Sequence, residues 1–311
     1  MPGALKIPVI FTGPPELLSP NADNGSFGRV CAVQLAYPKK FSTLTTDRDG
    51  ILQEATWEVQ KVAVKQILYL GNLPEYRQCA RVVREARIWN KMRHKNIVPL
   101  FGLWNDFSKE SPFPAFISPW FDEGNLKSFL DKNEATSKGQ RLSFKKNHCI
   151  PASLVHNHEY EVVHRDLRAD NVLVQNFTAY VADFGISRID DKTKGFSTQP
   201  MNQNPRYIAP ERIFNPSEDD DALKPTVESD IYEFGSVFLE IWTGKFPWNE
   251  ERIAAKIYLK RHKHETPRRP SSMDDHMWSF IQQCWARDRH SRPLAKDCLD
   301  VVVKLKNKIV E

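Results

Sequence analysis

The chain has 311 residues, of which 41% are hydrophobic and 27% charged, so it is ordinary globular material, long enough for one large core or two small ones. Its net charge of +5 is modest and its basic residues are mostly dispersed, which gives no indication of nucleic-acid binding. A basic cluster at residues 260–269 is interpreted as a solvated loop after a helix rather than as a docking patch.

The cysteines and the amino-terminal residues bear on the compartment. The five cysteines lack the paired spacing of a zinc site and are odd in number, so we expect neither disulfides nor zinc. Within the first 18 residues, the apolar run at 7–11 is far too short for a signal peptide or a membrane span. We therefore expect a soluble protein of the cytoplasm, with access to the nucleus left open, and no membrane partner.

In chain order, the first part predicts strands. Residues 1–22 carry several prolines and little periodicity, which predicts an arm ahead of a domain over residues 23–311. Alternating apolar residues predict strands at 31–37 and 59–68. The polar, Thr-rich stretch 39–58 between them is interpreted as an enlarged loop.

A glycine-containing turn and a helix accompany these strands. Gly25 and Gly28 allow backbone N–H groups to approach phosphate oxygens without a side-chain clash. Apolar residues recur at helical intervals over 75–91, which predicts a helix that carries Glu85. A further strand is expected at 113–121.

The stretch 143–157 is polar where a buried helix would be apolar, and it contains Pro151. Proline inside a helix costs about 3 kcal/mol unless it occupies the first turn. Two interpretations follow: either a short helix starts near Pro151, or a piece of the chain has been lost.

Four sequence signatures follow one another along the chain. They are Val62-Ala63-Val64-Lys65, His164-Arg165-Asp166-Leu167-Arg168-Ala169-Asp170-Asn171, Asp183-Phe184-Gly185 and Ala209-Pro210-Glu211. Their order is that of the protein-kinase signature set. From about residue 24 to residue 311 the chain resembles the eukaryotic protein kinases, specifically their tyrosine-kinase-like branch.

The resemblance implies a fold of the α+β class, the bilobal protein-kinase fold. A small, mostly antiparallel β lobe with one main helix is expected over residues 23–118, a hinge over 119–121, and a larger, mainly α-helical lobe over 122–311. It also implies that Glu211 pairs with Arg292 and that Asp230 ties down the catalytic loop.

The same resemblance implies catalytic roles. Asp166 is expected to be the base that accepts the substrate hydroxyl proton, while Asn171 and Asp183 are the expected Mg²⁺ ligands. Lys65 is expected on the α- and β-phosphates with Glu85 as its partner. Arg168 is a further expected catalytic residue, at the position where serine/threonine kinases usually carry lysine.

ATP and Mg²⁺ are the cofactors that the resemblance implies. Besides Lys65, Glu85 and Asp183, the residues expected around the nucleotide are Gly25, Gly28, Val30, Ala63, Ser118, Pro119, Phe121 and Leu173. Ser118 takes the gatekeeper position, and the chain carries Asp23 where the family has its first loop glycine.

A protein substrate is the implied partner, with phosphorylation of Ser197 or Thr198 in the activation segment 186–207 as a hypothesis for control. The run Asn204-Pro205-Arg206-Tyr207 favours serine or threonine over tyrosine as the acceptor. Oligomeric state is left open.

Two other functions remain as alternatives. A catalytically impaired pseudokinase that acts as a scaffold is suggested by Asp23 and by the irregular stretch around Pro151. A small-molecule phosphotransferase of kinase-like fold is disfavoured by Ala209-Pro210-Glu211 and by the Cys284/Arg292 motif, which serve a protein-substrate platform.

Overall fold

The computed structural model describes ten stretches of the chain, which group into two compact units. One unit holds the residues up to Lys91 together with Pro99–Trp120, and the other holds Met92–Val98 and the residues from Phe121 onward. The described residues are 10–11, 16–17, 23–25, 28–38, 57–67, 75–105, 111–132, 149–183, 204–213 and 224–308. Nearly all of the expected loop 39–58 lies outside them, as do Phe184, Gly185, Ser197 and Thr198.

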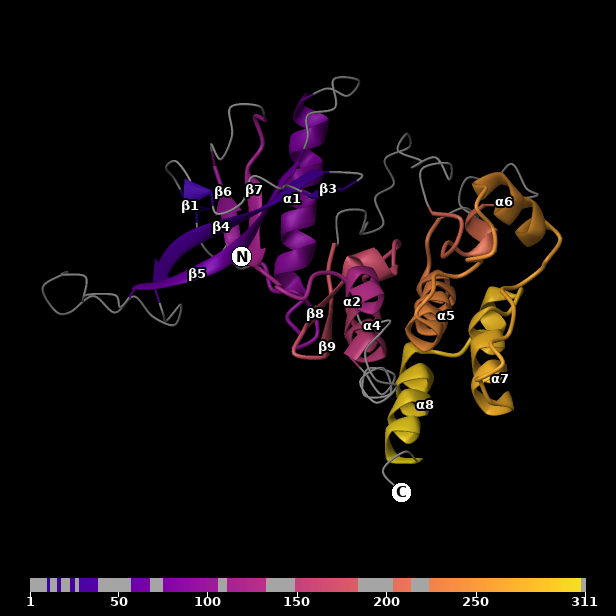
Figure 1. Ribbon diagram of the computed structural model, residues 1–311. Helices are drawn as coiled ribbons and strands as arrows, with labels where there is room; N and C mark the ends of the chain where they lie inside the picture. Colours follow the sequence, from indigo (N-terminus) through magenta and orange to yellow (C-terminus); the bar gives the residue numbers. More distant parts are fainter. Residues whose placement is uncertain are drawn as a thin grey trace, which may run out of the picture. The chain divides into compact units, whose positions relative to one another are not determined.

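The first unit is built on a seven-stranded sheet in the order β1-β6-β7-β5-β4-β2, with β3 paired to β4 (Figure 1). All its pairings are antiparallel except that of β1 with β6, so the mostly antiparallel β lobe is confirmed. The expected arm supplies β1 and β2 to this sheet. The strands are β1 Ile10–Phe11, β2 Glu16–Leu17, β3 Asp23–Gly25, β4 Gly28–Pro38, β5 Trp57–Ile67, β6 Gly102–Trp104 and β7 Ala115–Pro119.

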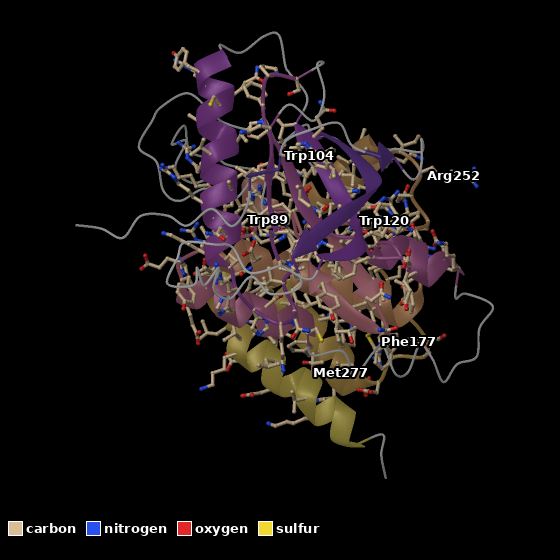
Figure 2. All side chains as sticks on the ribbon, turned by 90° about the vertical axis from the view of Figure 1, so that its left-hand side faces the viewer. Trp89, Trp104, Trp120, Phe177, Arg252 and Met277 are labelled. Atoms are coloured by element: carbon tan, nitrogen blue, oxygen red, sulfur yellow. The ribbon has the colours of Figure 1, made fainter. Side chains whose placement is uncertain are left out.

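The two faces of this sheet have different tasks. Val62 and Val64 alternate with half-buried residues along β5 and join a core cluster with Trp104, Ala115 and Ile117. On the opposite face lies the predicted helix, α1 Glu75–Lys91, whose two ends match the prediction. Its Trp89 packs against Phe116 of β7 with the ring centroids 5.8 Å apart, and Figure 2 shows Trp89 on the side of α1 toward the sheet.

The second unit is mainly helical, as predicted, and carries one small hairpin (Figure 1). The family fold inferred from the sequence is therefore the fold observed. No described helix is both long and apolar enough to cross a membrane. The elements are α2 Leu126–Lys132, α4 Cys149–Glu159, η1 Ala169–Asn171, β8 Val172–Gln175, β9 Thr178–Val181, η3 Pro210–Arg212, α5 Val227–Thr243, α6 Ala254–His262, α7 Asp275–Cys284, η5 Arg289–Ser291 and α8 Ala295–Lys308.

Helix α5 forms the centre of this unit, and its residues 229–241 are all buried. It packs against α4 and α7. A capping box of Thr226 and Ser229 fixes its start, and Gly244, with φ 72°, ends it in the left-handed conformation that favours glycine. A Cβ atom on Gly235 would lie 2.8 Å from the Cβ of Cys284, so only glycine allows α7 to approach this closely.

Residues 92–98 belong to the mainly helical unit, although we expected the whole of 23–118 in the small lobe. The reason is their backbone pairing: Val98 N donates to Val181 O at 2.9 Å, and Val181 N donates to Asn96 O at 2.9 Å. The division after Trp120 falls within the expected hinge, residues 119–121.

The irregular stretch before the catalytic loop resolves into a short helix. Helix α4 begins at Cys149, so Pro151 lies in its first turn, where the missing N–H would have no intrahelical partner. The first of our two interpretations is thus confirmed for the described part of this stretch, residues 149–157. The stretch is indeed polar at a buried position, because the side chain of Asn157 is completely buried.

The expectation for the basic cluster at 260–269 was wrong in part. Its first three residues form the last turn of α6 rather than a loop. Arg261 has only 2% of its surface exposed, and its guanidinium donates to Pro205 O at 2.5 Å and lies over the ring of Tyr232. The long arginine side chain is buried because it ties α6 to the segment 204–207.

Replacing Asn157 by leucine should stabilise the protein. Neither polar atom of its buried amide has a hydrogen-bond partner in the part of the chain that the structure describes. Because burying an unbonded amide costs about 1–3 kcal/mol, Asn157→Leu should raise the free energy of unfolding by a similar amount, measured by urea denaturation. The control is Ser153→Ala on the same helix, which removes a satisfied hydrogen bond to Ile150 O and should not stabilise. A lower unfolding free energy for Asn157→Leu would contradict the prediction.

Candidate active site

The hairpin of β3 and β4 carries the first expected phosphate-binding residues. Gly25 and Gly28 are direct partners across the hairpin, so both glycines flank its tip. Two strand residues further, Val30 pairs with Lys65 of β5. Partners in an antiparallel pair point to the same face, and this brings Val30, which is expected around the nucleotide, next to Lys65, which is expected at the α- and β-phosphates.

Lys65 forms the ion pair that we predicted. Its Nζ lies 3.2 Å from Oε1 of Glu85, which projects from α1. The side chains are 15% and 5% exposed, so water screens the pair little and the ammonium group is held in place. Lys65 lies on the same face of the sheet as Phe116, its cross-strand partner, and this is the face that α1 covers.

The remaining residues of this unit that are expected around the nucleotide lie where β5 meets β7. Ala63 pairs with Ser118, and Val62 pairs with Pro119. Ser118 is 8% exposed. Since Ala63 lies two residues before Lys65, Ala63 and Ser118 share the face on which Lys65 lies.

The catalytic loop of the second unit is held through its backbone. The carboxylate of Asp230 accepts from His164 N at 2.8 Å and from Arg165 N at 2.9 Å, as predicted. His158 Nε2 lies 3.1 Å from the same carboxylate. Although burial opposes ionisation, these hydrogen bonds and the nearby histidines keep the pKa of Asp230 below its usual value. An ionised, fully buried carboxylate therefore fixes the start of the loop.

Asp166, the expected base, follows directly. The amide nitrogen of Asn171 donates to Asp166 O at 2.8 Å and to Asp166 Oδ2 at 3.0 Å. Burial raises the pKa of Asp166, and the Asp183 carboxylate adds to this rise, while Arg168 and His164 oppose it. A carboxylate with a raised pKa is a better proton acceptor than an ordinary aspartate.

Asp183 follows the last residue of β9 by two positions, and the backbone bonds of Ala182 fix it close to Asn171 and His164. Ala182 N donates to Asn171 O and its carbonyl oxygen lies 2.9 Å from His164 Nε2. Directly after it, Asp183 has φ 64°, a left-handed conformation that is uncommon for aspartate. Such a conformation persists only where the surroundings impose it, and here it places the carboxylate within electrostatic reach of Asp166.

Asn171 and Asp183 suit a hard cation. Asn171 turns its amide nitrogen to Asp166, which leaves the amide oxygen as the end available to a metal. Mg²⁺ prefers oxygen ligands and is usually bound by one or two carboxylates or amides together with phosphate oxygens and water. Among the described residues no three acidic, histidine or cysteine side chains cluster as a complete metal cage, and this Mg²⁺ arrangement needs none.

Arg168 is paired within the loop. Its guanidinium bonds to Asp170 through Nε at 2.8 Å and through Nη2. Burial works against its charge, but the carboxylates of Asp170 and Asp166 more than offset it, so the pKa of Arg168 is raised. The arginine thus stays a fixed cation beside the expected base.

The last two expected nucleotide residues also lie in the second unit. Leu173 is a half-buried residue of β8 that pairs with Tyr180 of β9 and bridges to Asn125. Phe121 packs on Tyr180 with the ring centroids 5.0 Å apart. Leu173 therefore lies in the small hairpin β8–β9 and Phe121 packs against it, and the second strand of this hairpin leads to Asp183.

The segment 204–213 is held in place by two arginine residues. The predicted pair is present, with Arg292 Nη1 and Nη2 at 2.7 and 2.8 Å from the two oxygens of Glu211. Arg206 donates to the carbonyl oxygens of Pro247, Trp248 and Glu251. These bonds hold the described end of the activation segment in one place.

Three buried charged residues around the loop were not foreseen. Glu233 of α5 accepts from Leu167 N at 2.7 Å and pairs with Arg212 at 2.7 Å. Glu240 accepts from the hydroxyl of Tyr207. Glu233 and Glu240 lie three and ten residues after Asp230, on the same side of the helix at 3.6 residues per turn. This spacing was the available signal.

Comparison with known proteins supports one family. The sequence model of the family described as "Protein tyrosine and serine/threonine kinase" matches residues 22–302 of the chain. This range holds the Lys65–Glu85 pair of the first unit and the loop residues Asp166 and Asn171 of the second. The match and the geometry therefore point to the same family.

The chain is similar to several longer proteins. It is 27% identical over 260 residues to serine/threonine-protein kinase CTR1 of Arabidopsis thaliana, which covers 81% of this chain and 30% of CTR1. It is 27% identical over 272 residues to probable serine/threonine-protein kinase pats1 of Dictyostelium discoideum, covering 82% and 8%. It is 25% identical over 279 residues to serine/threonine/tyrosine-protein kinase HT1 of Arabidopsis thaliana, covering 87% and 66%. The chain thus spans less than a third of the length of the first two.

The buried carboxylate of Glu240 should make stability depend on pH. Burial raises its pKa from 4.5 to about 7, so between these values the folded state keeps a proton that the unfolded state releases, and stability falls as pH rises. The full effect is roughly 3 kcal/mol. Glu240→Gln keeps an oxygen for Tyr207 but cannot ionise. Between pH 4.5 and 8 the unfolding free energy of the parent should therefore fall by that amount relative to the unfolding free energy of the variant. Parallel curves in urea titrations would contradict this.

Proposed function

The chain belongs to the protein tyrosine and serine/threonine kinase family, and we propose that it transfers the γ-phosphoryl group of ATP to serine or threonine hydroxyls of protein substrates. The observation that carries the proposal is the arrangement of Asp166, which is bonded to Asn171 and within electrostatic reach of Asp183. The Lys65–Glu85 ion pair of the other unit supports it.

Asp166 acts on the acceptor hydroxyl in this proposal. Its carboxylate accepts a hydrogen bond from the hydroxyl and orients the oxygen toward the γ-phosphorus. It takes the proton as the new P–O bond forms, while the bond from the γ-phosphorus to the bridging oxygen breaks and ADP leaves. The bond from Asn171 to Oδ2 leaves Oδ1 for this contact. Arg168, fixed by Asp170, supplies positive charge beside the site where negative charge is redistributed.

Lys65 and the metal ligands act on the nucleotide. The Lys65 ammonium, aimed by Glu85, neutralises charge on the α- and β-phosphates. Asn171 and Asp183 would hold Mg²⁺, which supplies charge neutralisation on the β- and γ-phosphate oxygens. The hairpin glycines, Gly25 and Gly28, let backbone N–H groups approach the same phosphates.

Serine or threonine is the acceptor that we favour over tyrosine. The support is the run Asn204-Pro205-Arg206-Tyr207 and the names of the relatives CTR1 and pats1 as serine/threonine-protein kinases. HT1 is named a serine/threonine/tyrosine kinase, so the test below includes all three acceptors.

The pseudokinase alternative is not favoured. A scaffold has no need of an ion pair between Lys65 and Glu85, or of a left-handed Asp183 held beside Asp166. One of its two motives also loses force, since Pro151 fits the first turn of α4.

Incorporation of labelled phosphate from Mg-ATP into the full chain and into a general protein substrate tests the proposal. Asp166→Asn should lower the rate roughly 10²- to 10⁴-fold, because it removes the proton acceptor. Lys65→Met should also abolish most transfer, whereas Lys61→Met should not. Lys61 is a matched control because it lies on the same strand and face but contacts Trp120 instead of Glu85.

Phosphoamino-acid analysis of the product then identifies the acceptor. Phosphoserine or phosphothreonine supports the proposal, and phosphotyrosine alone would reverse the acceptor assignment. The proposed activity would be overturned in favour of a scaffold if the parent is folded and binds ATP but transfers no more phosphate than the Asp166→Asn variant.

A further inference from the structure

The catalytic loop has a second attachment to α5 besides Asp230. The carboxylate of Glu233 accepts from Leu167 N at 2.7 Å, and the guanidinium of Arg212 donates to Arg165 O at 2.7 Å. Arg212 and Glu233 pair with each other at 2.7 Å. We call this Arg212–Glu233 pair, with its two bonds to the loop, the second clamp.

The two clamps enclose Asp166 from both sides. Asp230 binds the N–H groups of His164 and Arg165, ahead of Asp166, and Glu233 binds the N–H group of Leu167, just after it. Glu233 follows Asp230 by three residues on α5, so both carboxylates rise from one face of a rigid, buried helix. The position of Asp166 is thereby defined at each end by a fixed carboxyl group.

The second clamp also holds a strained residue. Arg165 has φ 78°, a conformation that costs a non-glycine residue free energy and persists only where the surroundings impose it. Its N–H is bound by Asp230 and its C=O by Arg212. Without Arg212, one of these two restraints on the backbone next to Asp166 is lost.

Stability alone does not account for the pair. The side chains of Arg212 and Glu233 are 4% and 2% exposed. At such burial, the loss of hydration largely cancels the attraction, and an apolar pair of similar volume often stabilises a protein equally well or better. What an apolar pair cannot supply is the two bonds to the backbone of the loop.

We propose that Arg212 and Glu233 are positioning residues that hold the catalytic loop in the geometry in which Asp166 accepts the substrate proton. This inference rests on the proposed kinase activity. Arg212 directly follows Glu211, which Arg292 anchors. The clamp therefore also bonds the segment 204–213 to the loop, so displacement of that segment reaches Arg165 and, through it, Asp166.

The test replaces both charges at once in the full chain. The single variants leave a buried charge without its partner and are expected to fold poorly. The double variant Arg212→Met/Glu233→Leu leaves no buried charge and fills the space with apolar groups, so it should fold, with a lower thermal midpoint because Leu167 N and Arg165 O lose their partners. Its kcat per folded molecule should fall roughly 10- to 100-fold with the KM for ATP unchanged, because small displacements of a catalytic group have effects of this size.

Ser236→Ala is the matched control. Ser236 lies on α5, one turn after Glu233, and its hydroxyl accepts from Trp285 Nε1 at 3.2 Å without touching the loop. This variant loses a buried hydrogen bond of the same helix, so its thermal midpoint should fall while its kcat per folded molecule stays that of the parent.

Hydrogen exchange of a peptide that covers residues 164–167 gives a readout that does not need activity. Exchange should be faster in the double variant than in the parent and unchanged in Ser236→Ala. If the double variant matches the parent in both kcat and exchange, the clamp is only a packing feature and the proposal is overturned. If the parent itself transfers no phosphate, the proposed function fails, and exchange alone then decides whether the clamp holds the loop.

Discussion

The mainly helical unit depends on one constraint: residues 164–167 lie outside its helices and strands, so their backbone N–H groups have to find acceptors elsewhere. The four consecutive N–H groups of residues 164–167 each find an acceptor, two on Asp230, one on His164 and one on Glu233. Helix α5 supplies three of these bonds from within a fully buried stretch. An unbonded buried N–H group is costly, so the loop is fixed through its main chain, and of its own side chains only that of His164 serves as an acceptor for it.

Carboxylates can serve as these acceptors because the unit tunes their ionisation. Hydrogen bonds keep the pKa of Asp230 low despite burial, while burial raises the pKa of Glu233 to about 8 even beside Arg212. Burial likewise raises the pKa of Asp166. Burial and the neighbouring carboxylates thus work against ionisation of these groups, while Arg212 and the backbone N–H groups of the loop favour it.

Much of the fold and of the site could be predicted, and the exceptions share a cause. The resemblance to the kinases predicted the pair of Lys65 with Glu85, the attachment of the loop to Asp230 and the pair of Glu211 with Arg292. Arg212, Glu233 and Arg261 were missed because a charged residue in a helical pattern usually faces water, and only the tertiary fold buries it. Residues 92–98 were placed in the wrong unit for a similar reason, since their backbone pairs with β9, more than 80 residues away. The roles of the site residues toward ATP, Mg²⁺ and substrate remain predictions.

Attachment through the main chain has a consequence for how this chain can vary. Asp230, Glu233 and Arg212 contact backbone N–H and C=O groups of the loop, which every amino acid except proline supplies in the same form. Side chains at 165 and 167 can therefore change without releasing the loop from α5, whereas the ring of His164 also accepts the N–H of Asp166. Proline is the exception, because it lacks the N–H group, and its fixed φ near −65° conflicts with the φ of 78° at Arg165. Divergent members of the family could thus lose the recognisable letters of this motif and keep its shape.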